Sequence, residues 1–410
     1  MRYHRESMIE KEEITVSTKH LGLRIAAFVV VFFIAVAAFT NGVLGISNKK
    51  PGYYAIDTEP DEEAPMYAQN VSTNLYFTGE SAEIKRSLME AKGAYSAALQ
   101  RAKKLTDAKM TYTGFQNIAS LNAKPGQTLR VGSELCAMLR SAYEKTKENA
   151  GYNVFAGALN AEWETLLYLE EPQPFDPMND SLQAERIRRL VTETNELSNF
   201  TLEFPDSESV CFDMSESYRR LLGELEITAP VLDLGFLRDA YALDLVKTSL
   251  EEAGYRQGYM SCGAFTLMLS QEGEGAYCIY GNTADGVLAL ASLEAAKGSA
   301  CCEIRSFPFA GESGYYSVED VPRHDAVDAR TGYPGTALSS LYVVDEKGSA
   351  AQAAFEALRL FSISAEEWEK LECPLPFACT LPGGGREVYT NTPDRILPST
   401  ENISTIVDVR

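Results

Sequence analysis

Two segments of the chain place carboxylates and glycines together in a way that could hold a phosphorylated ligand. In residues 231–265, an apolar run that predicts a strand ends at Asp233, and a glycine turn at Gly235 and a predicted helix follow. A glycine lets the backbone approach a ligand closely, and the N-terminus of a helix favours anionic groups such as a pyrophosphate. Residues 323–335, RHDAVDARTGYPG, predict a compact polar turn. Each segment alone is more often an ordinary strand, turn or loop, so only the pair is informative.

The chain lacks the motifs of several common catalytic sites. It has no GxxxxGKS or GxxxxGKT phosphate loop, no GxSxG elbow and no HExxH helix. Two of its three histidines, His4 and His20, precede an apolar segment, so a Ser-His-Asp triad would have to use His324. No nearby sequence resembles the strained turn that presents a catalytic serine. These absences exclude P-loop nucleotide chemistry and leave the usual hydrolase interpretations weak.

The composition of the 410 residues limits the class of protein. Hydrophobic residues make up 45% of the chain, which is enough to bury a sizeable core and excludes intrinsic disorder as the main description. The 37 Lys and Arg against 58 Asp and Glu give a net charge of −21. A surface this acidic repels phosphate backbones, so nucleic acid is not an expected partner.

An uncharged apolar run, residues 25–46, predicts one transmembrane helix. At about 1.5 Å per residue, its length matches a bilayer's hydrocarbon core of about 30 Å. The basic residues before it place residues 1–24 in the cytoplasm and the main domain outside the cell membrane: Arg2, Arg5, Lys11, Lys19 and Arg24. We expect residues 47–65 to form a polar tether and residues 66–410 to form a single domain. A buried core helix, or a signal peptide cleaved within the run, are the alternatives.

Helical and strand patterns are interleaved along the exterior region. Apolar residues three and four apart predict four helices, with Ser133 as the N-cap of the second: residues 81–106, 133–149, 243–253 and 349–361. Alternating or β-branched runs predict strands at residues 128–131, 200–204, 266–269, 276–280 and 339–344. This order argues for an α+β fold and against a regular βαβ repeat. All eight cysteines lie here, where disulfides are possible, although spacing fixes no pairing.

Taken together and in order, the motifs resemble the ApbE family of FAD:protein FMN transferases. The family's DLGGIAKGYAVD is matched by 233-DLGFLRDAYALD-244, and its HHIIDPRTGYP by 324-HDAVDARTGYP-334. Three further matches keep the family's order: 117-NIASLN-122, 149-NAGYNVFAGALNAEW-163 and 351-AQAAFEAL-358. Several weak motifs in one order are far more specific than any one of them. The resemblance covers most of residues 66–360.

The resemblance implies a fold, a reaction and a location. Members of the family are α+β proteins outside the cytoplasmic membrane that bind FAD and Mg²⁺. They move FMN from FAD onto a Thr or Ser of a partner flavoprotein and release AMP. For this chain, the resemblance implies one flavin transferase domain behind the transmembrane helix, with FAD as substrate and an extracytoplasmic flavoprotein as acceptor.

The resemblance also implies site residues, although it points to no catalytic residue. It implies FAD contacts at Ala150, Gly151, Tyr152, Asp233, Asp239 and Val327. It implies that the metal is held by the carbonyls of Phe236 and Phe355 and the side chains of Gln352 and Glu356.

Several ligand-facing positions depart from the family pattern. Where the family has an Asp and a Thr four residues apart on a helix, this chain has Gln352 and Glu356, which keep two oxygen donors and one negative charge. Phe236 replaces the second glycine of DLGG and crowds the approach of FAD. Three interpretations stay open: a divergent FMN transferase with an altered metal site, a non-catalytic flavin-binding or partner-binding ectodomain, and a tethered structural ectodomain without a ligand.

Overall fold

The three-dimensional structure is a computed structural model of the chain. It describes residues 48–56, 71–148, 151–269, 275–296, 298–363, 373–402 and 404–409. The predicted membrane anchor, residues 25–46, lies outside these ranges. Within them, no helix is both long enough and apolar enough to cross a bilayer.

Residue contacts divide the chain into two compact units: residues 1–51 with 78–85, and residues 52–77 with 86–410. In the described part of the first unit, the backbone N–H of Lys49 donates to the Ser81 hydroxyl at 2.9 Å. Strand β1 (Gly52–Ala55) belongs to the second unit, although it lies in the segment predicted to be a tether. The predicted limits of the tether and the domain stay predictions.

A sheet of nine strands forms the centre of the second unit. All neighbouring strands are antiparallel except the last two, β17 and β19, which are parallel. In spatial order the strands are β1, β2 (Ser72–Phe77), β6 (Gly258–Cys262), β7 (Phe265–Met268), β10 (Ala300–Arg305), β15 (Ser340–Asp345), β16 (Phe377–Thr380), β17 (Glu387–Thr390) and β19 (Thr405–Asp408).

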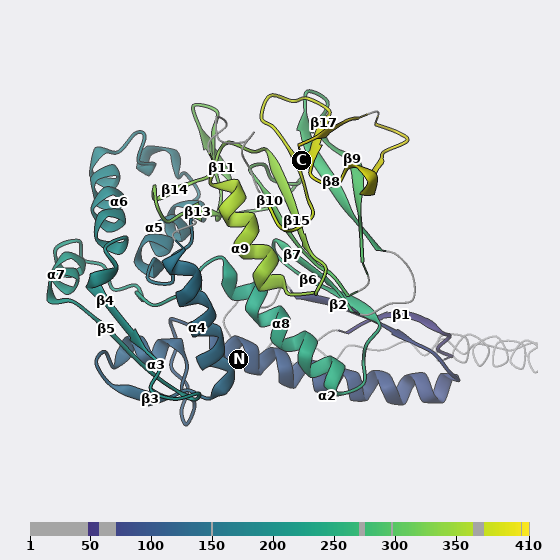
Figure 1. Ribbon diagram of the computed structural model, residues 1–410, viewed down its shortest axis with the longest axis horizontal. Coiled ribbons are helices and arrows are strands. Elements are labelled where there is room, and N and C mark those ends of the chain that lie inside the picture. The colour runs from purple at the N-terminus through teal and green to yellow at the C-terminus, as the bar shows by residue number, and fades with distance from the viewer. Residues whose placement is uncertain are drawn as a thin grey trace, which may run out of the picture. The chain divides into compact units, whose positions relative to one another are not determined.

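A second sheet and two helices cover the nine-stranded sheet (Figure 1). The second sheet packs its buried side chains against Cys301, Tyr342 and Val344, and consists of β18 (Ile396–Pro398), β9 (Gly286–Ala295) and β8 (Gly275–Thr283). Because side chains alternate along a strand, the neighbouring Cys302 and Val343 point to the opposite face. Helices α8 (Leu237–Glu252) and α9 (Ala350–Phe361) lie along β6, β7, β10 and β15.

A mostly helical region lies beside this layered part in Figure 1. It contains α3 (Ile118–Ala123), α4 (Ser133–Lys147), α5 (Gly157–Leu167), α6 (Ser181–Thr194), α7 (Glu216–Glu224) and a sheet of β3 (Thr128–Arg130), β5 (Ser209–Met214) and β4 (Phe200–Glu203). Helix α2 (Ser81–Thr106) precedes them in the chain. Two short hairpins link the helical region to the layered part, β11 (Tyr316–Val318) with β12 (Val321–Arg323) and β13 (Val327–Asp328) with β14 (Tyr333–Pro334).

The α+β fold is confirmed, as are the four predicted helices and the strands predicted at residues 128–131, 200–204, 266–269, 276–280 and 339–344, with two corrections. Helix α8 begins at Leu237, well before the predicted residue 243. The prediction of Ser133 as an N-cap is wrong, because Gly132 holds that position with φ +85°. Its N–H and that of Val131 both donate to the Glu208 carbonyl, and this fixes a conformation that glycine adopts without strain. The eight cysteines, all within the described ranges, are free thiols.

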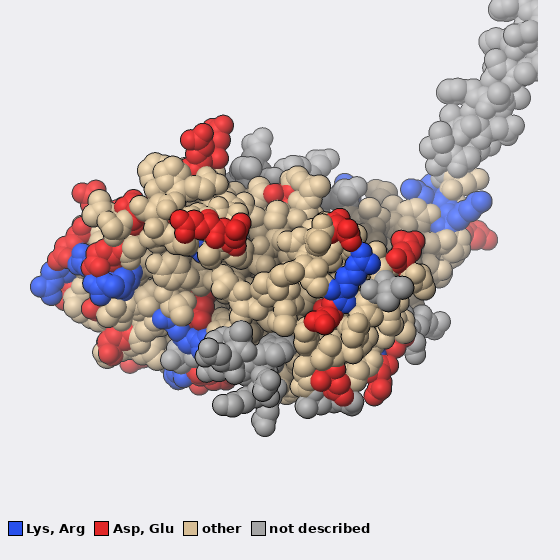
Figure 2. Space-filling view, turned by 90° about the horizontal axis from the view of Figure 1, so that it is seen from above, with Lys and Arg blue, Asp and Glu red and all other residues tan. Residues whose placement is uncertain are grey.

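Acidic side chains are spread over the face shown in Figure 2, and most Lys and Arg side chains there lie beside them. Pairs such as Arg101 with Glu134 and Arg130 with Glu208 are exposed. Exposed ion pairs of this kind contribute little to stability, so the surface charge bears on partners more than on the fold.

Helix α9 is anchored at its N-terminus by a carboxylate from α8. The Asp244 side chain accepts from the backbone N–H groups of Ala350 and Ala351, at 2.8 and 3.1 Å, and from the Ser349 hydroxyl at 3.0 Å. The first N–H groups of a helix have no partner within it, so an acceptor from another element fixes how the two helices meet. Asp244 therefore sets the position of α9 relative to the loop that precedes α8.

Replacing Asp244 should destabilise the protein through this helix end. We expect Asp244→Ala to lower the free energy of unfolding by about 2 to 3 kcal/mol, because donors at the buried end of α9 lose their acceptor. Asp244→Asn keeps one acceptor oxygen and should cost about half as much. Urea unfolding of the three proteins provides the measurement, and an Asp244→Ala variant as stable as the wild type would contradict the anchoring role.

Candidate functional site

The two polar segments singled out in the sequence meet at one cavity, which we call the flavin-site cavity only because the sequence predicts FAD contacts among its residues. Its volume is about 180 Å³, and its walls come from α5, the loop before α8, the β6–β7 turn and the chain before β13. The residues that line it are Asn160, Trp163, Glu164, Leu167, Tyr168, Asp233, Gly235, Phe236, Arg238, Asp239, Gly263, Ala264, Phe265, Asp325 and Val327. Four predicted site residues, Asp233, Phe236, Asp239 and Val327, are therefore brought together.

The loop that carries Asp233 is held by a side chain, and the strand predicted before it is absent. The Asn122 carbonyl oxygen accepts from the N–H groups of Val231 and Leu232, and its amide donates to the Leu232 carbonyl at 2.8 Å. The Asp233 N–H donates to the Val154 carbonyl at 2.9 Å. One half-buried side-chain amide therefore satisfies the backbone groups that a strand partner would otherwise satisfy, so an apolar run without strand pairing is stable here.

Two glycines let this loop pass close to α5. A Cβ added to Gly157 would lie 2.4 Å from the Pro230 carbonyl oxygen, so α5 can approach the loop only with glycine at its first position. Gly235 has φ +54°, and a Cβ there would lie 2.6 Å from the Asn160 amide nitrogen. The glycine predicted to permit close approach to a ligand also permits close approach between the loop and α5.

The second polar segment is the β13–β14 hairpin, which is fixed by the aromatic core of the helical region. The Gly332 N–H donates to the Asp328 carbonyl at 2.7 Å, and the Gly332 carbonyl accepts from the Trp163 indole at 2.7 Å. Just before the hairpin, the buried Arg323 guanidinium donates to both carboxylate oxygens of Asp176, at 2.7 and 3.1 Å. The predicted compact turn is confirmed, and Val327 reaches the cavity from its first strand.

Carboxyl groups dominate the charge of the flavin-site cavity. Glu164, Asp233, Asp239 and Asp325 line it, against a single guanidinium from Arg238, which pairs with Asp239 at 3.3 Å. Loss of hydration raises the pKa of Asp233, an effect that Arg238 opposes. Loss of hydration also raises the pKa of Asp325, and the nearby Asp239 raises it further. Such a surface suits a neutral ring that donates N–H hydrogen bonds and repels a free diphosphate.

The Phe236 ring forms part of the cavity wall. It packs edge-on against Phe265 with ring centroids 5.2 Å apart. Both rings line the remaining space. The aromatic replacement therefore narrows the cavity without filling it, and supplies apolar surface on which a flat ring could rest.

Of the FAD contacts predicted at residues 150–152, neither Gly151 nor Tyr152 lines the flavin-site cavity. Ala150 lies outside the described residues. Gly151, with φ +87°, is buried, and its carbonyl accepts from the Ala329 N–H at 2.9 Å. The buried Tyr152 hydroxyl has no hydrogen-bond partner among the described residues, and burial, followed by Tyr241 and Asp233, raises its pKa well above the usual value. An orphaned hydroxyl beside Asp233 is the kind of group that a bound ligand or water would satisfy.

A second cavity of about 730 Å³ adjoins the first and shares Glu164 and Tyr168 with it. Lys109 lies on its wall and pairs with Glu164 at 2.6 Å. Small-molecule sites usually span about 300 to 1,000 Å³. The flavin-site cavity is too small for a dinucleotide on its own, whereas the two together have the necessary room.

The residues at the predicted metal positions do not fit Mg²⁺. Gln352 and Glu356 lie on α9 and are not among the residues that line the cavity. The Glu356 carboxylate accepts from Arg359 Nε at 2.8 Å and from Gln352 Nε2 at 3.4 Å. The carbonyls of Phe236 and Phe355 belong to the start of α8 and the interior of α9, where they accept helix hydrogen bonds.

A divalent cation such as Mg²⁺ needs several oxygen donors. Glu356 is the only carboxylate among the four predicted ligands, and the positive charge of Arg359 beside it opposes the binding of a cation. Across the described residues, no group of three or more His, Cys, Asp or Glu side chains is arranged to hold a metal ion. The assignment of the four residues as metal ligands stays a prediction.

His324 is a structural residue in the hairpin region. It is fully buried, with Nε2 2.9 Å from the Gly335 carbonyl and Nδ1 3.3 Å from the Ala326 N–H. These partners require a proton on Nε2 and a lone pair on Nδ1. Burial lowers the pKa of His324 to about 4, so the ring is neutral at physiological pH and both its nitrogens are occupied.

The fold and the cavity define a class of α+β protein with a small acidic site between a helical region and a sheet. A family model described as the ApbE family matches residues 73–372. This protein therefore belongs to the ApbE family. No curated protein matches the chain.

Three solved structures share this fold. The ApbE protein of Thermotoga maritima MSB8 has a TM-score of 0.57 at 16% identity, over 85% of this chain and 97% of that one. The flavin transferase ApbE of Vibrio cholerae has a TM-score of 0.55 at 13% identity, over 83% and 97%. The flavinyl transferase ApbE of Pseudomonas stutzeri, in its apo form, has a TM-score of 0.51 at 13% identity, over 82% and 93%.

Several residues of the site are missed by the sequence analysis. Tyr168, Arg238 and Phe265 line the flavin-site cavity, and Lys109 lies in the adjoining one. Arg238 sits inside the recognised 233–244 motif and could have been found as its only cation. Phe265 ends the 231–265 segment and could also have been found there. Tyr168 and Lys109 reach the two cavities only through tertiary packing, so sequence spacing gives no signal for them.

The depressed pKa of His324 predicts a loss of stability in acid. The folded pKa of about 4 lies below the unfolded value of about 6.5, so this contribution is present above pH 6.5 and is lost as the pH falls through 4. The difference corresponds to about 3 kcal/mol. We therefore expect the free energy of unfolding to fall by about 3 kcal/mol more in the wild type than in His324→Gln when the pH is lowered from 7 to 4. Urea unfolding of both proteins at the two pH values provides the measurement. Equal losses in the two proteins would refute the assignment.

The metal positions can be tested by restoring the family pattern. We expect Gln352→Asp combined with Glu356→Thr to bind Mg²⁺ measurably in calorimetry, because it removes the partner of Arg359 and adds a carboxylate one turn earlier. The wild type should show no such heat. Glu356→Gln, which removes the ion pair without building a ligand set, is the matched control and should also be silent. Tight Mg²⁺ binding by the wild type would contradict the conclusion that the residues at these positions do not fit Mg²⁺.

Proposed function

We propose that the chain is an FAD:protein FMN transferase of the ApbE family that acts on a Thr or Ser of an extracytoplasmic flavoprotein. The observation that carries the proposal is the meeting of the 233–244 and 324–334 motifs at one cavity, with Asp233, Asp239 and Val327 on its walls. The acidic, partly aromatic cavity would hold the neutral isoalloxazine ring. The adjoining cavity, with Lys109, would hold the nucleotide half of FAD.

The proposed reaction is a phosphoryl-group transfer. The acceptor hydroxyl oxygen forms a bond to the flavin-side phosphorus of FAD, and the bond from that phosphorus to the bridging oxygen breaks. AMP leaves with the electron pair of that bond, and the proton of the hydroxyl passes to a base or to water. The Asp325 carboxylate lines the cavity, and its raised pKa makes it a stronger base than an ordinary aspartate, so it would be a competent proton acceptor.

The proposal includes a location. Residues 25–46 would anchor the chain in the cell membrane, with residues 1–24 in the cytoplasm and the flavin transferase domain outside. The resemblance also implies dependence on Mg²⁺. Because Glu356 pairs with Arg359, the residues at the predicted metal positions do not support that part of the proposal.

The ion pair between Glu356 and Arg359 favours a second candidate function, a non-catalytic flavin-binding ectodomain. If no metal ion binds here, the transfer reaction lacks a strong positive charge at the bridging oxygen. Such a loss ordinarily lowers the rate by orders of magnitude. Binding of FAD without release of AMP is the result that distinguishes this candidate from the transferase.

Blocking one cavity should locate the FAD site. We expect the full chain to quench FAD fluorescence with micromolar affinity, and Ala264→Trp to weaken the binding by at least about tenfold, because the indole fills most of the small cavity. Ala284→Trp, at an exposed position on a different cavity, is the matched control and should leave the affinity unchanged.

Transfer is then assayed with a Thr-containing acceptor polypeptide, by covalent flavin fluorescence and AMP released in equal amounts. Transfer supports the first candidate, and binding without AMP supports the second. If the wild type does not bind FAD, both candidates fail.

A further inference from the structure

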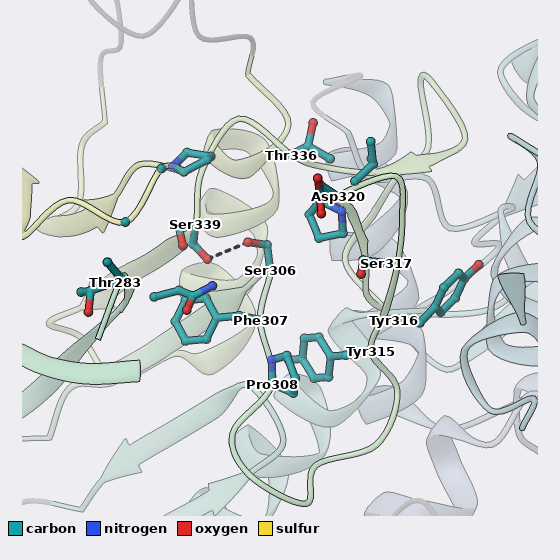
Figure 3. A pocket seen from close by; sticks show the side chains of 17 residues that line it. Thr283, Ser306, Phe307, Pro308, Tyr315, Tyr316, Ser317, Asp320, Thr336 and Ser339 are labelled. Carbon is teal, nitrogen blue, oxygen red and sulfur yellow. Dashed lines mark hydrogen bonds between the residues drawn. The ribbon is translucent and has the colours of Figure 1, made fainter. Parts of the chain in front are cut away.

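A larger groove lies outside the flavin-site cavity, between the sheet and the β11–β12 hairpin (Figure 3). It encloses about 760 Å³. One wall comes from the ends of β8, β10 and the chain before β15, with Thr283, Ser306 and Ser339. The facing wall comes from the hairpin, with Ser317 and Asp320. Figure 3 shows these side chains on opposite sides of the open space, with Thr336 at one end.

The charge of the groove excludes a phosphate ligand. Among its described lining residues, Asp320 alone is charged, and no Lys or Arg is present. A phosphate group there would lose hydration without a cation to compensate and would face a carboxylate. The groove is therefore not the place for the diphosphate of FAD. Hydroxyl groups, aromatic rings and prolines make up most of the rest of its lining, and they suit a neutral or mildly basic polypeptide.

Strand β11 is an edge strand within the described part of the chain, and its Ser317 lines the groove. The turn residues of the hairpin, Glu319 and Asp320, both have positive φ, and Val318 pairs with Val321 across them. The next pair joins Ser317 to Pro322, which has no N–H. Antiparallel pairs alternate between hydrogen-bonded and non-bonded, so the Ser317 N–H and carbonyl point away from β12, toward the outer edge. An extended segment can add to such an edge through backbone hydrogen bonds.

The base of the hairpin is rigid. The Tyr316 hydroxyl donates to Asp176 at 2.9 Å, and Arg323, directly opposite Tyr316, pairs with the same carboxylate. This buried arrangement holds both strands to the helical region. The outer edge is therefore presented in one position, which lowers the entropy cost of adding a strand to it.

One end of the groove is adjacent to the flavin-site cavity. Tyr315 lines the groove, and Asp325 lines the cavity. Pro322 of the groove and Asp325 of the cavity are three residues apart in the chain, so their Cα atoms lie no more than about 11 Å from each other. A segment lying along the groove would thus end beside the place where the flavin would bind.

We propose that the groove binds the acceptor polypeptide as an extended strand against β11, with the residue to be modified directed toward the flavin-site cavity. This inference rests on the proposed function, since it names where the second substrate of that reaction lies. The groove binds the segment by its backbone at Ser317, and Asp320 favours a basic residue in it.

The test uses the full chain and a phage-displayed library of peptides, each with one fixed central Thr. Peptides selected on the wild type are then titrated against two variants at one position. Ser317→Pro removes the outward N–H and should weaken peptide binding by about tenfold. Ser317→Ala removes only the hydroxyl and should bind within about twofold of the wild type. FAD affinity, measured by fluorescence quenching, should be the same in all three proteins.

Three outcomes would overturn the proposal: no peptide is selected, Ser317→Pro binds peptide as well as Ser317→Ala does, or Ser317→Pro loses FAD binding while its thermal midpoint is unchanged. The last would make the groove part of the flavin site. If Ser317→Pro fails to fold, Thr336→Arg, an exposed position on the groove, replaces it and should abolish peptide binding. If the wild-type protein binds the selected peptides but does not bind FAD, the proposed function is refuted and the groove is still a peptide-binding site.

Discussion

The close approach of the 230–236 loop to the first turn of α5 is the constraint on which the site depends. Gly157 permits it, because any Cβ there would collide with the Pro230 and Val231 carbonyls. Asn122 then satisfies the loop's backbone groups, which leaves the loop free of strand pairing. With the loop seated in this way, Asp233 and the start of α8 face α5 across the flavin-site cavity. Asp244, further along α8, fixes α9 in turn.

The distribution of charge is the second constraint on which ligand the site can bind. The flavin-site cavity carries four carboxyl groups and one guanidinium, an arrangement that favours a neutral hydrogen-bonding ring over a phosphate. On α9, the one carboxylate at the predicted metal positions is neutralised by Arg359. The chain therefore has the family's fold, while the carboxylate at its predicted metal positions is held in an ion pair.

Much of the fold could be predicted from the sequence, because its periodic patterns are strong. Helix α2 spans residues 81–106, as predicted, and the five predicted strands are present within a few residues. The strand predicted before Asp233 was wrong, since a side chain from α3, far away in the sequence, satisfies that backbone. The cap of α4 was also wrong, because a glycine conformation fixed by Glu208 overrides the preference for serine.

The residues of the candidate site that lie within the 233–244 and 324–334 motifs could be predicted from the sequence. Asp233, Asp239 and Val327 lie in matched segments and line one cavity. Tyr168 lies outside those motifs and reaches the cavity only through tertiary packing. The pairing of Glu356 with Arg359 follows from i, i+3 spacing on one helix, yet spacing alone cannot tell whether a carboxylate holds a metal or a guanidinium.

Hydrogen exchange of the full chain, with and without FAD, would locate the flavin site. We expect FAD to slow exchange at residues 233–239 and 325–328, where the two motifs meet, and to leave residues 315–318 and 336–339 of the groove unchanged. Slowed exchange confined to the groove, or no change at either place, would contradict the assignment of the cavity as a flavin site.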